Sequence, residues 1–82
     1  MMYQVEIFVT YKESILDPQG EAIQEAVNQM GYREVESVRQ GKYFELEISK
    51  DVADVQATVE AICDKLLANV TMEAYRYTIK EA

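Results

Sequence analysis

The 82-residue chain carries 15 acidic and eight basic residues, for a formal net charge of −7 at pH 7, and 49% of it is hydrophobic. A chain of this length forms one domain, which we place over residues 1–82. The acidic balance argues against nucleic acid or an anionic membrane surface as a partner, because both attract clusters of Lys and Arg. No apolar run approaches the ~20 residues that span a bilayer, and no secretory signal pattern is present, so we expect a cytoplasmic location.

Catalytic residue types are scarce. Histidine is absent, which excludes Ser-His-Asp and Cys-His catalysis, and a single cysteine excludes thiolate zinc sites. That cysteine, Cys63, falls in an apolar helical stripe, which predicts a buried structural thiol. We therefore predict no catalytic residue, no cofactor site and no metal site in this chain, and expect it to act by association.

The first third of the chain predicts a strand followed by a helix. Residues 3–11 alternate between apolar and polar side chains, which is the period of a strand with one buried face. Asp17 and Pro18 then form a helix start, in which Asp17 caps free N–H groups and Pro18 occupies the first position. The helix is predicted to end at Gly31 in the left-handed conformation.

The middle of the chain predicts a hairpin. Residues 34–40 indicate a second strand, although Val35 and Val38 have opposite parity along it. Gln40 and Gly41 form a predicted turn, and residues 42–49 alternate cleanly.

The last third predicts a helix and a strand. Asp51 is the expected cap of the helix, and Asn69 is expected to end it in the left-handed conformation. The apolar positions between them recur at helical spacing, namely Val55, Val59, Ile62, Cys63, Leu66 and Leu67. Residues 72–80 then alternate as a final strand.

This β-α-β-β-α-β order predicts an α+β, ferredoxin-like fold, with a four-stranded antiparallel sheet and two helices on one face. The other face stays open. By parity it carries both aromatic and charged side chains, namely Phe8, Tyr43, Glu45, Glu47 and Arg76. We expect self-association through this face or a sheet edge, because so short a chain has a small core.

Two local patterns allow a functional and an ordinary interpretation. Gly41-Lys42 lacks the earlier Gly and the following Ser or Thr of a phosphate-binding loop, so a turn is the better interpretation. Arg33, Arg39 and Lys42 are either ordinary surface charge or a positive patch that pairs with an acidic partner surface.

Several segments together resemble one known family. They are Leu16-Asp17-Pro18-Gln19-Gly20, Gly31-Tyr32 with Val35, Val38-Arg39 with Gly41-Lys42-Tyr43, and Cys63-Asp64-Lys65-Leu66-Leu67-Ala68-Asn69 with Glu73 and Tyr75. In order and spacing they resemble PurS, the small subunit of phosphoribosylformylglycinamidine (FGAM) synthase, over roughly residues 3–80. Val70 and Gln40 depart from the family pattern, which leaves the local loop shapes open.

The resemblance implies a non-catalytic subunit of de novo purine biosynthesis. In that family a synthetase subunit, PurL, uses ATP and Mg²⁺ to convert formylglycinamide ribonucleotide to FGAM, with ammonia that a glutaminase subunit, PurQ, releases from glutamine. The resemblance further implies a homodimer or dimer of dimers that lets PurL and PurQ assemble. By motif, we expect the partner contacts to be Arg39, Lys42, Tyr43, Asp17 and Gln19. The alternative is a small-molecule-sensing regulatory domain of the same fold class.

Overall fold

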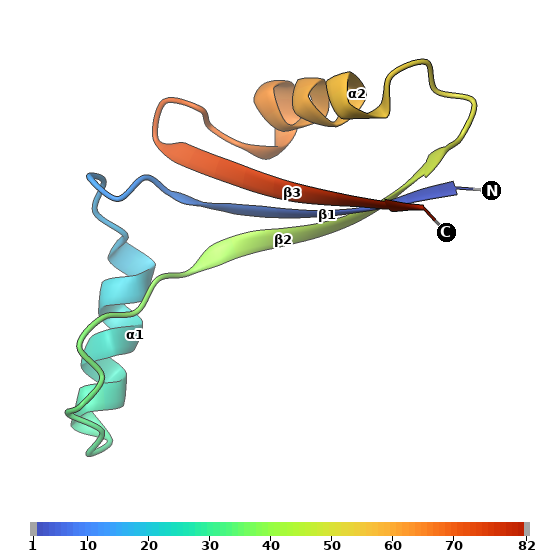
Figure 1. Ribbon diagram of the computed structural model, residues 1–82. Helices are drawn as coiled ribbons and strands as arrows, with labels where there is room; N and C mark the ends of the chain where they lie inside the picture. The colour runs from blue at the N-terminus through green and yellow to red at the C-terminus, as the bar shows by residue number, and fades with distance from the viewer. Residues whose placement is uncertain (1, 82) are drawn as a thin grey trace.

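A computed structural model describes residues 2–81 and shows an α+β fold with an antiparallel sheet. The predicted domain limits, Met1 and Ala82, lie outside the described residues. In chain order the elements are β1 (Met2–Tyr11), α1 (Pro18–Gln29), β2 (Gly41–Ser49), α2 (Val55–Ile62), the π-helical turn η1 (Cys63–Leu67) and β3 (Glu73–Glu81) (Figure 1).

The central strand of the sheet is β1. It pairs antiparallel with β2 on one side and with β3 on the other, so that Ile7 lies opposite both Phe44 and Tyr77. The strands predicted over residues 3–11, 42–49 and 72–80 are therefore confirmed. Their period-2 patterns were reliable because one face of each strand packs on the core.

The predicted four-stranded sheet is wrong, because the sheet among the described residues has three strands and residues 34–40 form none. The hairpin and its turn at Gln40-Gly41 are wrong with it, since β2 begins at Gly41. Residues 34–40 run beside α1 instead, and the Gln24 amide donates to the Glu36 carbonyl at 2.6 Å. The opposite parity of Val35 and Val38 also prevents the segment from presenting one apolar face to a core.

The prediction that two helices cover one sheet face is also wrong. Only α2 lies over the sheet, whereas α1 projects away from one end of it (Figure 1). The chain measures 51 × 27 × 14 Å, and its Cα radius of gyration is 16.4 Å. A compact domain of this length has a radius of gyration of roughly 12 Å. The excess shows that α1 lies outside the body of the domain.

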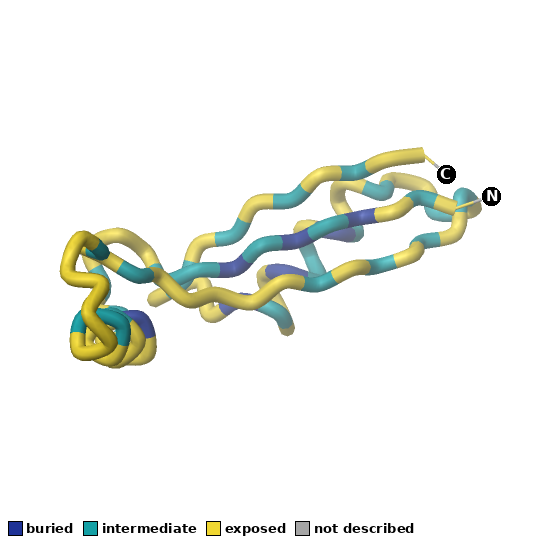
Figure 2. Tube along the Cα trace, turned by 90° about the horizontal axis from the view of Figure 1, so that it is seen from below, coloured by how far each residue is buried: buried dark blue, intermediate teal, exposed yellow. Residues whose placement is uncertain are grey.

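The core is small and lies between β1 and α2. Val5, Ile7 and Val9 of β1 are buried against Val59 and Cys63 (Figure 2). The buried thiol predicted at Cys63 is confirmed. Burial raises the pKa of this thiol, and the nearby carboxylates of Asp64 and Glu60 raise it further. A raised pKa keeps the sulfur protonated and unreactive, as suits a core position.

Both ends of the second helix differ from the prediction. Asp54, not Asp51, is the N-cap, and its Oδ1 accepts from the Ala57 N–H at 3.1 Å. At the other end the Ala68 N–H donates to the Cys63 carbonyl at 2.9 Å, which closes a π turn. No described residue other than glycine has a positive φ, so the left-handed end predicted at Asn69 is wrong. The wider turn leaves Leu66 79% exposed, although it fits the predicted apolar stripe.

Within residues 2–81, neither helix has the length and apolar character needed to cross a membrane.

Replacing Ile7 should test how much of the stability rests on this single layer. Ile7 is fully buried, so Ile7→Ala should lower the free energy of unfolding by about 2–5 kcal/mol. Leu66→Ala removes a similar volume from an exposed site and should cost about 0.5 kcal/mol or less. Urea unfolding followed by circular dichroism measures both variants. Equal losses would contradict the assignment of the core.

Candidate partner-binding surface

The projecting part of the molecule, residues 17–40, is a helix with a returning segment, which we call the arm. At its far end Gly31 has φ of +106°, as predicted, and the chain reverses there. The Tyr32 N–H donates to the Val27 carbonyl at 3.2 Å, and the Gly31 N–H donates to Asn28 at 3.1 Å. This pattern is a Schellman motif, which satisfies the carbonyls at the end of α1.

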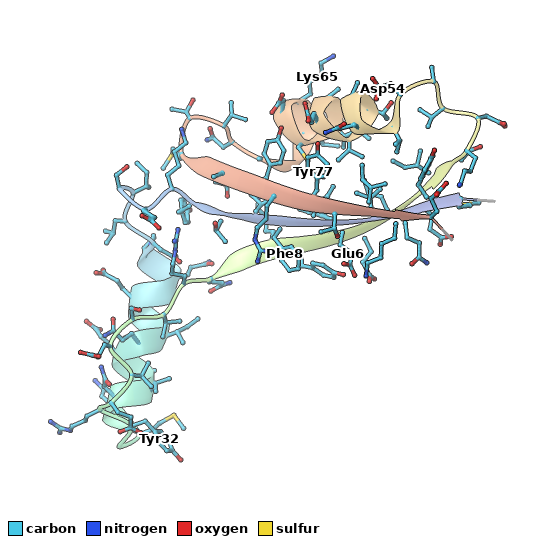
Figure 3. All side chains as sticks on the ribbon, in the orientation of Figure 1. Glu6, Phe8, Tyr32, Asp54, Lys65 and Tyr77 are labelled. Carbon is cyan, nitrogen blue, oxygen red and sulfur yellow. The ribbon has the colours of Figure 1, made fainter. Side chains whose placement is uncertain are left out.

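The arm exposes much of its apolar surface. The returning segment shields only the side of α1 that carries Gln24, Val27 and Asn28, which are half-buried. Ile23 and Met30, seven residues apart on one helix face, remain 41% and 71% exposed. Tyr32 is exposed at the far end of the arm (Figure 3). An amphipathic helix whose apolar face meets water is a surface suited to a partner.

The arm joins the sheet at a junction that we call the elbow, where Tyr11, Asp17 and Gln40 meet. Asp17 Oδ1 accepts from the Gly20 N–H at 3.0 Å, which caps α1, and Asp17 Oδ2 accepts from the Gln40 N–H at 2.8 Å. The hydrogen bonds from Gln40 first, and then from Gly20, hold the pKa of the Asp17 carboxyl below its ordinary value. Arg39 donates to the Tyr11 carbonyl and is a second link between the arm and β1.

Lys42, at the start of β2, joins three elements. Its ammonium group donates to the Leu67 carbonyl at 3.3 Å, at the end of the second helix, and lies 3.6 Å from Glu73 Oε2 at the start of β3. A cation at the C-terminal end of a helix is favourable because the free carbonyls there carry partial negative charge. Glu73 also accepts from the Asn69 N–H at 2.8 Å.

Gln19 is exposed on the first turn of α1. It lines a hollow of about 180 Å³ together with Lys42 and Glu73. Asp17 and Arg39 line a neighbouring hollow of about 530 Å³ between the arm and the loop that follows β1.

Tyr43 lies apart from these residues, on the sheet face opposite α2. Its ring packs on Phe8 with 4.8 Å between centroids, and the Arg76 guanidinium lies 4.4 Å from the Phe8 centroid. The Tyr43 hydroxyl lies within hydrogen-bonding distance of Glu6 (3.1 Å) and Glu45 (3.0 Å). Figure 3 shows Glu6 and Phe8 on this face, and Tyr77 on the side of α2. The predicted open face, with aromatic and charged side chains, is confirmed.

The structure thus brings four of the five predicted contact residues together at the elbow: Asp17, Gln19, Arg39 and Lys42. Three of them, Asp17, Arg39 and Lys42, form hydrogen bonds within the chain. The patch considered for Arg33, Arg39 and Lys42 does not form, because Arg33 lines a hollow with Asn28 and Gln29 near the far end of α1.

Sequence reasoning included Gly20 in the family motif but missed its role in the packing of the arm. A Cβ atom there would lie 2.3 Å from the Val38 carbonyl oxygen, so the returning segment can approach α1 only because residue 20 is glycine. A glycine inside a predicted helix, where it costs stability, was the signal available in the sequence.

Fold and surface together define a small α+β protein with no large core, in which the arm and the open sheet face carry exposed apolar and aromatic side chains. Comparisons with known proteins identify the family. Residues 4–81 match the PurS family model, described as phosphoribosylformylglycinamidine (FGAM) synthase. The chain belongs to the PurS family, as the resemblance indicated, and is a subunit of FGAM synthase.

Individual relatives agree with this assignment. The chain is 51% identical to the PurS subunit of Bacillus subtilis over 98% of its own length and 95% of that protein. It is 42% identical to the subunit of Synechocystis over 94% of its length and 78% of that protein.

Solved structures agree as well. A crystal form of B. subtilis PurS superposes with a TM-score of 0.93, with 98% of this chain and 100% of that chain covered, at 51% identity. A chain from a structure of PurLQS of Thermotoga maritima superposes with a TM-score of 0.85 at 26% identity, covering 98% and 99% of the two chains. These relatives favour the assembly subunit over the sensing domain.

Tyr43 gives a test of the open face. Burial, together with the carboxylates of Glu45 and Glu6, raises the pKa of Tyr43 from 10.0 to about 12. The protonated phenol is favoured in the folded state, so its contribution to stability is complete below pH 10 and is lost as the pH rises through 12. In a phenolate absorbance titration, Tyr43→Phe should remove amplitude near pH 12.

Tyr75, whose pKa is also raised to about 12, is the matched case on the helix side of the sheet. Tyr75→Phe should remove a comparable amplitude near pH 12, and the double variant Tyr43→Phe/Tyr75→Phe should remove the sum of the two. The assigned environment is wrong if the amplitude removed by Tyr43→Phe lies at pH 10 instead.

Proposed function

We propose that this chain is the assembly subunit of FGAM synthase, which lets the synthetase PurL and the glutaminase PurQ work as one enzyme. The observation that carries the proposal is the arm, an amphipathic helix held out from the sheet in a chain of the PurS family. The solved structure of PurLQS from T. maritima supports the identity of the partners. In this proposal PurL binds ATP and Mg²⁺ and forms FGAM from formylglycinamide ribonucleotide, PurQ supplies ammonia from glutamine, and the complex is cytoplasmic.

The large exposed surface of the chain suggests that part of it is buried against a partner in the working complex. The chain exposes 6100 Å². A compact monomer of its size exposes roughly 5,000 Å². The difference, about 1,100 Å², is comparable to the roughly 800 Å² that each partner contributes to a stable interface.

We further propose that part of this surface forms a homodimer or a dimer of dimers. The apolar face of α1 supports this more strongly than the open sheet face, where Phe8 is half-buried and Tyr43 is engaged with acidic neighbours. We propose contact roles for the surface residues Gln19 and Tyr43, and for Lys42, whose side chain is half-exposed. We propose that Asp17 and Arg39 hold the arm in place through hydrogen bonds within the chain and do not contact a partner themselves.

Reconstitution tests the assembly role. PurL and PurQ from the source of this chain are mixed with and without it, and FGAM formation is measured with glutamine and, separately, with ammonium as the nitrogen donor. The chain should be required for glutamine-dependent synthesis and much less for ammonium-dependent synthesis, because only the first needs both partners. Equal glutamine-dependent rates with and without the chain would contradict the proposal.

The apolar face of α1 gives a test of self-association. The double variant Ile23→Glu/Met30→Glu places two charges on that face and should shift the chain to a smaller oligomer in sedimentation velocity, because burying unpaired charge is costly. Gln29→Glu, on another side of the same helix, is the matched control and should leave the oligomer unchanged. A wild-type chain that is monomeric at every concentration would contradict self-association.

A further inference from the structure

Among the described residues, the main links between the arm and the body of the molecule lie near the elbow. Within residues 2–81, α1 makes no extensive contact with the sheet or with α2. The chain leaves the sheet at Tyr11 and returns to it at Gly41, so the direction of the arm depends on how these two segments are held. Two hydrogen bonds join them there, from Gln40 N–H to Asp17 Oδ2 and from Arg39 to the Tyr11 carbonyl.

Asp17 divides its two oxygens between different tasks. Oδ1 caps α1 through the Gly20 N–H, as Asp54 Oδ1 caps α2 through Ala57. Asp54 has no counterpart to the second bond of Asp17, which runs from Oδ2 to Gln40 across 23 positions of sequence. Helix capping needs only one acceptor, so the second bond is not explained by the helix.

Gly20 brings the two segments close enough for this bond. A Cβ atom at position 20 would lie 2.3 Å from the Val38 carbonyl oxygen and 2.7 Å from Asp17 Oδ2. Glycine inside a helix is unfavourable relative to alanine. The close approach across the elbow accounts for its presence.

We propose that Asp17 is a positioning residue, which clasps the outgoing and returning segments and so sets the direction in which the arm meets a partner. A 12-residue helix is about 18 Å long, so a rotation of about 10° at the elbow moves its far end by about 3 Å. Side-chain contacts tolerate gaps of only about 1 Å. Without the bond from Gln40 to Asp17, which we call the clasp, the arm points in the direction needed for binding for only part of the time. The apparent affinity of the chain for its partner falls by the same fraction.

The consequence for assembly rests on the proposed function, whereas the effect on the arm does not. Asp17→Asn separates the two tasks of Asp17, because the Gly20 and Gln40 N–H groups contact different carboxylate oxygens and the amide replaces one of these oxygens by an NH₂ group, which cannot accept. The variant therefore keeps either the cap or the clasp, but never both. Asp54→Asn is the matched control. It removes the charge of a helix cap that lacks a second, long-range bond such as the clasp from Gln40 to Asp17.

The direction of the arm is measured by double electron–electron resonance. Spin labels are placed at Gln29 and Glu47, both exposed, in a Cys63→Ala background, and labelled chain is diluted into excess unlabelled chain. Wild type and Asp54→Asn should give one narrow distance, and Asp17→Asn a broadened or shifted one. Gly20→Ala, which keeps Asp17, should shift the distance as well.

Assembly is measured with the same variants. Asp17→Asn should need about tenfold more chain for half-maximal glutamine-dependent activity, with the wild-type rate recovered at saturation. Unchanged distances in both Asp17→Asn and Gly20→Ala would overturn the clasp. Changed distances with unchanged half-saturation would overturn its positioning role. If wild type itself fails to support glutamine-dependent activity, the proposed function fails, while the distances still decide the clasp.

Discussion

The whole arrangement follows from a sheet that is covered by one helix. β1 is the central strand, and α2 with its π turn buries the face that carries Val5, Ile7 and Val9. α1 does not pack on the sheet beside α2, and projects from the end of the sheet instead (Figure 1). A core this small leaves a narrow stability margin, and covering the exposed face of α1 by association would widen it. A sheet covered by a single helix therefore accounts both for the small core and for an arm whose apolar face is exposed.

The sequence predicted local structure well and tertiary placement poorly. Alternation located all three strands, and Asp17, Pro18 and Gly31 located α1, because these signals act over a few residues. The periodicity of α1 shows that one face is apolar, but not whether that face is covered by the chain's own sheet or by another molecule. The fourth strand failed because Gln24 satisfies backbone groups of residues 34–40, and no pattern in a single sequence reports such a side-chain partner.

The predicted contact residues stay a prediction, but most of them lie together in the fold and form bonds within the chain. Motif matching located Asp17, Gln19, Arg39 and Lys42, which the fold gathers at the elbow from two segments about 20 residues apart in the sequence. A family motif shows that a residue type is found at the same position in related chains. It does not show whether that residue holds the arm or contacts a partner. The bonds from Gln40 to Asp17 and from Lys42 to Leu67 show that these side chains first serve the fold. In the proposed function, the surface that these residues orient makes the partner contact.

In this account the chain contributes geometry to FGAM synthase and leaves the chemistry to its partners. The most direct test compares amide hydrogen exchange of residues 17–40 in the dilute isolated chain and in the complex with PurL and PurQ. Backbone amides of α1 should exchange much more slowly in the complex, because a covered helix opens less often. Unchanged exchange throughout the arm, with slower exchange confined to the sheet, would contradict the claim that the arm is the surface used for assembly.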